Sequence, residues 1–294
     1  VFGYTRLMVA AFGVGGGEEA LARAIAYAQE REQFGEPLYR KQGFTHKLIV
    51  PHAVRLEAAR AYCEEVASRL DSGEEGLQVE GAVAKLFATE VGNAAADAAI
   101  QAHGGYGYTQ EYEVEKIRRD VRITTIYEGT SEIQQNIIGT HRWRAVVRSK
   151  GGFYRDMAAS LRELGTAEAT ALAADAMAET LLTCHAQKLP RLQYVMFELA
   201  RVAAEVETAV ALARKAATSS GALTELLVPC ARLHGAAAAR DVVTTGLRLI
   251  QGSGRYGADE VDAYRAAVRF DEVMASSSGE LEEMDRVAAA LVAQ

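Results

Sequence analysis

The sequence predicts an all-α protein: a four-helix up-and-down bundle over residues 1–150, followed by a second, degenerate helical bundle over residues 151–294. Only 4 of the 294 residues are proline, while Ala, Leu, Glu and Arg abound, which favours helices throughout. Apolar residues recur at helical spacing through several long segments. The turns between these segments are short, and short connections make successive helices antiparallel neighbours in a bundle.

The first helix is expected over residues 5–30, where Gly13, Gly15, Gly16 and Gly17 interrupt the apolar stripe. Each glycine weakens a helix by roughly 0.5–1 kcal/mol relative to alanine. Four glycines so close together imply either a tolerated flexible spot or close packing against a neighbour.

Three further helices are expected over residues 42–69, 79–100 and 131–148. Pro51 should kink the second of them, break it or mark its true start. Ser131 and Gln134 fit an S-x-x-Q capping box that would begin the fourth helix. Gly151 and Gly152 mark the expected junction between the two bundles.

Glu128 stands just before this fourth helix, on an apolar approach. The adjacent Gly129 permits an unusual backbone angle or the close approach of a ligand. Taken alone, these residues describe a solvated glutamate in a surface turn.

Four motifs in order change this interpretation. They are the turn Arg31-Glu32-Gln33-Phe34-Gly35-Glu36-Pro37, the glycine-dense Gln101-Ala102-His103-Gly104-Gly105-Tyr106-Gly107, the charged segment from Tyr112 to Asp120, and Tyr127-Glu128-Gly129-Thr130. Together they resemble the C-terminal helical domain of acyl-CoA dehydrogenases, from about residue 2 to residue 141.

The resemblance implies an FAD-dependent enzyme that removes hydrogen from the α and β carbons of an acyl-CoA thioester and leaves trans-2-enoyl-CoA. Glu128 takes the role of the base that removes the α-proton. Gly129, Thr5 and Arg6 take the family's substrate contacts. Some family members carry the base on the first helix instead, where this chain has Thr5, and a threonine cannot serve as that base.

The resemblance also implies the cofactor residues, which are Arg31, Gln33, Phe34, Gln42, Gln101, Gly104, Gly105, Thr130 and Glu132. Arginine suits a pyrophosphate because its guanidinium binds two oxygens at once. In the family the matching arginine and the residue two positions on contact the FAD of a neighbouring subunit. From its turn alone Phe34 is a packing residue, and Glu132 would place an acid near pyrophosphate. His103 is expected to pack rather than to catalyse.

The second half repeats the first at an offset of 150 residues, which aligns Gln251-Gly252-Ser253-Gly254 with Gln101-Ala102-His103-Gly104. At this offset Ser278 replaces Glu128, so the second copy is expected to keep the fold without the base. A helical extension of this kind resembles the very-long-chain acyl-CoA dehydrogenase branch, whose tail accompanies dimers.

Composition and net charge limit the kinds of molecule that this protein is expected to bind. A net charge of −7 and a pI near 5.5 argue against nucleic-acid binding. Cys63, Cys184 and Cys230 lack any disulfide or zinc spacing, so we expect no metal and a cytoplasmic protein. Membrane contact is expected to be peripheral at most, since no strongly basic amphipathic helix is evident.

The family implies an acyl-CoA substrate, electron-transfer flavoprotein as the expected acceptor, and a homo-oligomer. The family's N-terminal helical domain and middle β-domain have no counterpart in this sequence, so the 294 residues alone are expected to be inactive. Two rival functions stay open, a DNA-binding relative without dehydrogenase activity and a structural helical module for oligomerisation.

Overall fold

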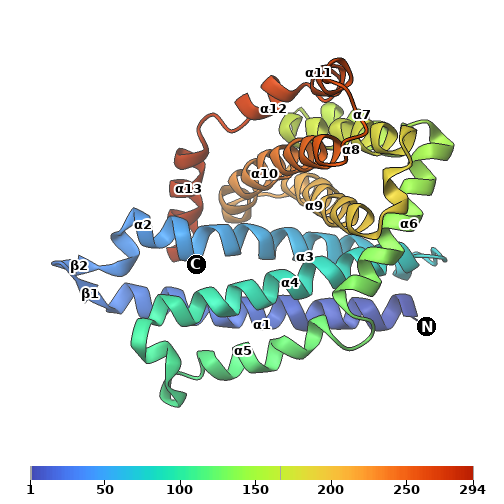
Figure 1. Cartoon of the computed structure of the whole chain (residues 1–294). Coiled ribbons are helices and arrows are strands. Elements are labelled where there is room, and N and C mark those ends of the chain that lie inside the picture. The colour runs from blue at the N-terminus through green and yellow to red at the C-terminus, as the bar shows by residue number, and fades with distance from the viewer. Residues whose placement is uncertain (1, 166, 294) are drawn as a thin grey trace.

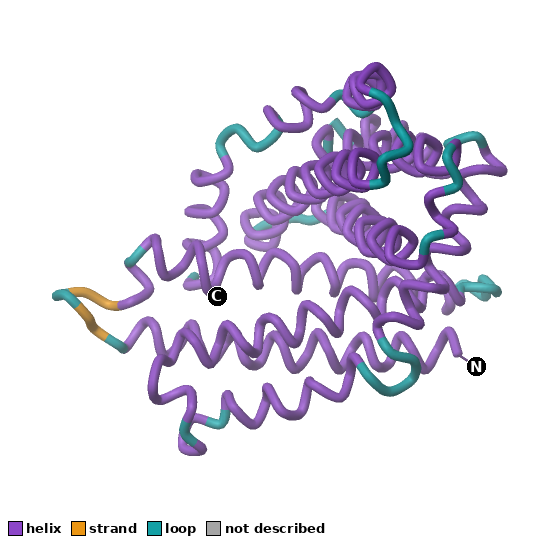
Figure 2. Tube along the Cα trace, viewed as in Figure 1, coloured by secondary structure: helices purple, strands orange, loops and turns teal. Residues whose placement is uncertain are grey.

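Helices make up nearly all of the structure, a computed structural model that describes residues 2–165 and 167–293 (Figures 1 and 2). The predicted all-α class is confirmed. Within the described ranges, the only strands are β1 (Glu32–Gln33) and β2 (Glu36–Pro37), which pair antiparallel across the turn that follows the first helix. No helix in these ranges is long and apolar enough to cross a membrane.

The first half follows the predicted order of helices. Its elements are α1 (Phe2–Glu30), the short α2 (Gln42–Phe44), α3 (Val50–Asp71), α4 (Gln78–His103), α5 (Val114–Arg122) and α6 (Ser131–Ser149). Pro51 marks the start of α3, where the missing N–H of proline costs no helical hydrogen bond. A π-helical turn, Thr45–Ile49, joins α2 to α3. The charged segment forms α5, a fifth helix packed on α1 and α4.

The glycines of α1 serve close packing at three of their four positions. A Cβ on Gly13 would lie 2.8 Å from the carbonyl oxygen of Ala88, and one on Gly17 would lie 2.9 Å from the Cα of Gly92. A Cβ on Gly16 would meet the side chain of Val121 on α5. Only Gly15 faces open space. The backbones of α1 and α4 therefore touch, which side chains would prevent.

In residues 152–165 and 167–293 the structure describes seven more α-helices. They are α7 (Gly152–Glu163), α8 (Glu168–Ala186), α9 (Gln193–Thr218), α10 (Ala222–Gly252), α11 (Ala258–Ala267), α12 (Phe270–Ala275) and α13 (Glu280–Val292). Lys150 and Gly151 both take left-handed backbone and turn the chain from α6 into α7.

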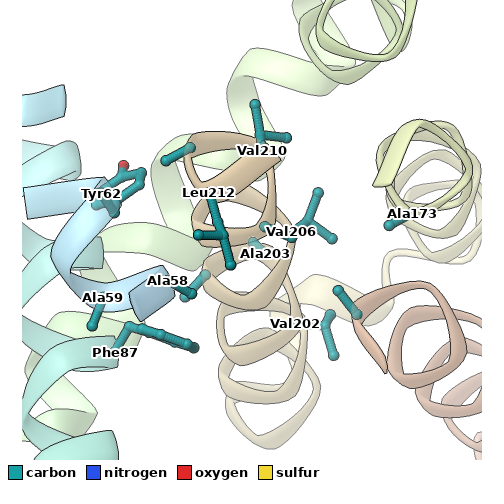
Figure 3. Packing of buried hydrophobic residues seen from close by; sticks show 14 of the residues in the cluster. Ala58, Ala59, Tyr62, Phe87, Ala173, Val202, Ala203, Val206, Val210 and Leu212 are labelled. Carbon is teal, nitrogen blue, oxygen red and sulfur yellow. The ribbon is translucent and has the colours of Figure 1, made fainter. Parts of the chain in front are cut away.

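One buried core runs through both halves. Helix α9 lies at its centre and contacts α3, α4 and α6 on one side and α7, α8 and α10 on the other. Figure 3 shows Val206, Val210 and Leu212 of α9 between Tyr62 of α3 and Ala173 of α8. Because the core is shared, the division into residues 1–150 and 151–294 stays a prediction.

The elements of the second half fall close to those of the first at the 150-residue offset. Subtracting 150 from the bounds of α9 and α10 gives 43–68 and 72–102, close to the α2–α3 segment and to α4. Gly104 and Gly254 have φ angles of 60° and 65°, and Gly129 and Gly279 have φ angles of 95° and 82°. Left-handed backbone thus recurs at corresponding turns.

Candidate active site

The turn that carries Glu128 has an uncommon backbone. Glu128 has a φ of 54° and Gly129 a φ of 95°, so two consecutive residues lie in the left-handed region, which non-glycine residues seldom adopt. A Cβ on Gly129 would lie 2.6 Å from Nε2 of Gln134, so no other residue fits there without displacing that side chain. Glu128 is exposed and projects from the mouth of α6.

The predicted capping box is wrong by one residue. Thr130, not Ser131, is the N-cap of α6, and its hydroxyl accepts from the N–H of Ile133. The Ser131 hydroxyl donates to Glu90 on α4 instead. The Gln134 amide, fully buried, turns back to the carbonyls of Glu128 and Gly129 at 3.1 and 2.9 Å. The glutamine therefore supports the turn rather than the helix end.

The predicted substrate residues meet the predicted base. The Thr5 hydroxyl at the start of α1 donates to Oε2 of Glu128 at 3.0 Å, although 123 residues separate them. The buried Arg6 donates to the Gln78 carbonyl at 3.3 Å. Burial lowers the pKa of Arg6, and the charge of Glu128 opposes this shift. Thr5, Arg6, Glu128 and Gly129 thus form one cluster, the base cluster.

An exposed apolar face borders the base cluster. Tyr4, Met8 and Phe12 recur every four residues along α1 and are 57–60% exposed. Ile126 and Tyr127 immediately precede Glu128 and are also exposed. Exposed apolar side chains grouped in this way favour contact with a ligand or with another protein segment.

Thr130 and Glu132 lie beside the base cluster, at a cavity of about 470 Å³ between α4, α5 and the mouth of α6. Two hydrogen bonds lower the pKa of Glu132, one with the Thr130 side chain and one with the backbone of Glu132 itself. Glu90 and Asp97 line the same cavity, and Asp97 pairs with Arg118. Three carboxylates (Glu90, Asp97 and Glu132) and two guanidinium groups (Arg118 and Arg122) therefore line this cavity, and the assignment of Glu132 to the cofactor stays a prediction.

Five of the other predicted cofactor residues meet elsewhere. They line a cavity of about 690 Å³ at the far end of α1 and are Arg31, Gln33, Gln101, Gly104 and Gly105. We call this set the cofactor cluster.

A guanidinium, two side-chain amides and bare backbone line this second cavity. A Cβ on Gly104 or Gly105 would meet nothing within 4 Å, so a ligand can approach the main chain at both positions. Arg31 stands 5.9 Å from the centre of the Tyr106 ring. These groups suit the phosphates and hydroxyls of a dinucleotide.

His103 packs, as expected. Its ring stacks on Tyr27 at 4.5 Å, and its Nδ1 is 2.7 Å from the Ala99 carbonyl oxygen. Burial lowers the pKa of His103, which keeps the ring neutral at physiological pH.

Phe34 and Gln42 lie outside this cavity. Phe34 sits at the tip of the β1–β2 turn, 94% exposed and with a φ of 56°. The Gln42 amide donates to Asp285 of α13 at 3.3 Å. The structure therefore does not bring Phe34 and Gln42 to the cofactor cluster. The Gln42 amide instead binds a residue of the second half of the chain.

The base and cofactor clusters lie at opposite ends of α1. At a rise of 1.5 Å per residue, Thr5 and Glu30 are roughly 37 Å apart along the helix. In Figure 1 the N-terminal end of α1 and the β1–β2 turn lie at opposite sides of the molecule.

Sequence reasoning missed Lys85. Its ammonium reaches the carbonyl of Gly129 at 2.6 Å from a completely buried position on α4. The signal was a single lysine inside the alanine-rich apolar helix expected over residues 79–100.

Comparison with known families matches residues 1–142 to the family described as "Acyl-CoA dehydrogenase, C-terminal domain". The Caffeyl-CoA reductase-Etf complex subunit CarC of Acetobacterium woodii is 43% identical over 133 residues, 45% of this chain and 35% of that protein. An acyl-CoA dehydrogenase of Bacillus subtilis is 43% identical over 138 residues, 46% of this chain and 35% of that protein. The aligned part of this chain thus spans about a third of the length of these relatives.

The fold of the whole chain also recurs. An acyl-CoA dehydrogenase from Bacillus anthracis, solved in complex with FAD, superposes on 99% of this chain and 56% of its own with a TM-score of 0.80. The sequences are 20% identical, so this likeness concerns the fold alone.

Proposed function

We propose that this chain, whose residues 1–142 match the acyl-CoA dehydrogenase C-terminal domain, is the C-terminal part of an FAD-dependent acyl-CoA dehydrogenase. The observation that carries the proposal is the base cluster, in which Thr5 and Arg6 from one end of the domain meet Glu128 and Gly129 from the other. An exposed carboxylate without such partners would be an ordinary surface residue.

The reaction assigned to Glu128 is removal of the α-proton of an acyl-CoA thioester. The Thr5 hydroxyl donates to one carboxylate oxygen and orients the group. The exposed apolar face beside it would meet the acyl chain or another segment of the full protein, and its covering would exclude water from the carboxylate. FAD, when bound, supplies the acceptor for the β-hydride, and the product is trans-2-enoyl-CoA.

The cofactor cluster fits one part of that FAD. Arg31 would hold phosphate oxygens, while the bare backbone at Gly104 and Gly105 and the amides of Gln33 and Gln101 would accept close contact. Because this cluster lies roughly 37 Å from Thr5, the FAD beside Glu128 would receive its Arg31 from a second chain. This supports a homo-oligomer.

The proposal also covers the electron acceptor, the branch of the family and the location of the protein. Electron-transfer flavoprotein is proposed as the acceptor, supported by the relative named as part of a reductase–Etf complex. The helical second half, a fold shared with the Bacillus anthracis enzyme, supports placement in the long-tailed, very-long-chain branch. A cytoplasmic location is proposed from the three free cysteines.

The test uses the full-length gene product. The protein should purify with FAD, and anaerobic acyl-CoA should bleach the flavin while the thioester loses two hydrogens by mass spectrometry. A full-length protein that binds no flavin and leaves acyl-CoA unchanged would favour the structural-module alternative instead.

A further inference from the structure

Lys85 is the most deeply buried cation near the base. Its side chain is 0% exposed, and the residues three and four positions away on the same face of α4 are also buried, namely Gly81, Ala82, Ala88 and Thr89. Lysine is almost never fully buried unless it is paired, because removing an ammonium from water costs several kcal/mol. A buried lysine at this position therefore needs a specific partner.

The partner is a main-chain oxygen of the base-bearing turn. Nζ of Lys85 donates to the Gly129 carbonyl at 2.6 Å. Nε2 of Gln134, also fully buried, donates to the same oxygen at 2.9 Å and to the Glu128 carbonyl at 3.1 Å. Two buried side chains thus hold two consecutive carbonyls from the interior.

These bonds act on a turn that is otherwise unfavourable. A non-glycine residue in the left-handed region costs roughly 1–2 kcal/mol, and such conformations persist only where surrounding contacts fix them. Glu128 is such a residue. Without the donors, the turn could relax and carry the carboxylate away from Thr5.

The charges around Lys85 keep its ammonium available. The pKa of Lys85 is lowered to about 8, mainly by burial and to a lesser extent by the charge of the nearby Arg6. The carboxylates of Glu90, Glu128 and Glu132 oppose that shift. The cation therefore faces acidic groups on α4, on the turn and on α6.

We propose that Lys85 is a positioning residue for the base: its ammonium holds the Gly129 carbonyl and so keeps the Glu128 carboxylate where Thr5 and the substrate meet it. The inference rests on the proposed function, since it takes Glu128 to be the base. Lys85 does not touch the reacting atoms.

The test compares variants of the full-length holoenzyme by stopped-flow reduction of its flavin with acyl-CoA. Lys85→Met keeps the length of the side chain and removes the donor and the charge. We expect the limiting rate of reduction to fall about 10²-fold, the scale for a misplacement of about 1 Å. The acyl-CoA concentration at half-saturation should change less than about threefold.

Lys85→Arg keeps a charged donor and should recover at least part of the rate. Lys47→Met, at an exposed position on the turn before α3, is the matched control and should behave as wild type. FAD content should be unchanged in all three variants, because none of them removes a residue of the cofactor cluster.

Two results would overturn the inference. One is a wild-type rate in Lys85→Met, and the other is equal slowing in the Met and Arg variants. If Lys85→Met does not fold, Lys85→Gln removes the charge and shortens the side chain while it keeps a polar end, and a wild-type rate there would count equally against the inference. A wild-type enzyme that never bleaches would instead refute the proposed function, so the two failures are distinguishable.

Discussion

Arg142 on α6 and Glu207 on α9 form a buried ion pair that joins the two halves of the chain. Nε and Nη2 of the arginine each donate to one carboxylate oxygen at 2.7 Å, and both residues are less than 10% exposed. Tyr62 of α3 and Tyr154 of α7 donate their hydroxyls to the same carboxylate. Since α6 begins at the base-bearing turn, this pair anchors the active-site helix to the second half.

Removal of the arginine should therefore destabilise the whole fold. Arg142→Met leaves the Glu207 carboxylate buried without its cation, and we expect the free energy of unfolding to fall by about 3–5 kcal/mol. Arg162→Met, which breaks exposed pairs with Asp175 and Glu168, should cost about 0–1 kcal/mol. Urea unfolding measures both, and equal losses would contradict the anchoring role.

The contact between α1 and α4 gives a second stability test. A Cβ on Gly92 would lie 2.1 Å from the Gly13 carbonyl oxygen, so Gly92→Ala should cost about 1–3 kcal/mol by overpacking. Gly15→Ala, where a Cβ meets open space, should stabilise by roughly 0.5–1 kcal/mol. Thermal unfolding should shift in opposite directions for the two variants. A loss of stability in both would mean that α1 is not packed as described.

His234 should make the fold sensitive to acid. It is fully buried, its Nε2 lies 3.0 Å from the Thr208 hydroxyl, and burial lowers its pKa to about 3 from 6.5. Below pH 6.5 the unfolded chain binds a proton that the folded chain refuses, so stability falls as pH drops from 6.5 toward 3.

The expected slope from this histidine is up to about 1.4 kcal/mol per pH unit. His234→Gln keeps a hydrogen-bonding side chain that does not titrate in this range. Unfolding free energies measured from pH 7 to pH 4 should therefore fall less steeply in the variant. If the unfolding free energies of wild type and variant fall equally steeply with pH, His234 does not contribute to the acid sensitivity.

The separation of the two clusters predicts subunit complementation. Arg31→Ala and Glu128→Gln should each inactivate the full-length enzyme, the first by weakening FAD binding and the second by removing the base. Mixed oligomers can combine Glu128 from one variant with Arg31 from the other. For a dimer with random mixing, about a quarter of the wild-type activity should return. If mixing restores nothing, each FAD would have to be held by a single chain.

The long helices were predictable because apolar spacing determines them. The expected range of residues 79–100 became Gln78–His103, and residues 131–148 became Ser131–Ser149. The site residues were identified through motifs, and the structure then brought Thr5 to Glu128.

Long-range packing was harder to foresee. Hydrogen bonds to main-chain carbonyls leave no sequence pattern, so the partner of Lys85 and the true role of Gln134 could not be inferred. Local sequence also fits either of two adjacent hydroxyl residues as the cap of α6, and Thr130 rather than the predicted Ser131 performs that function. The contact between Gln42 and Asp285 spans 243 residues and could not be read from local spacing.

The most direct test of the account is the rate at which acyl-CoA reduces the flavin of full-length Glu128→Gln, with Glu75→Gln, at an exposed position between α3 and α4, as the matched control. Loss of a general base should slow reduction by at least about 10²–10⁴-fold, while FAD stays bound. The Glu75 variant should reduce at the wild-type rate. Bleaching at the wild-type rate in Glu128→Gln would contradict the assignment of Glu128 as the base.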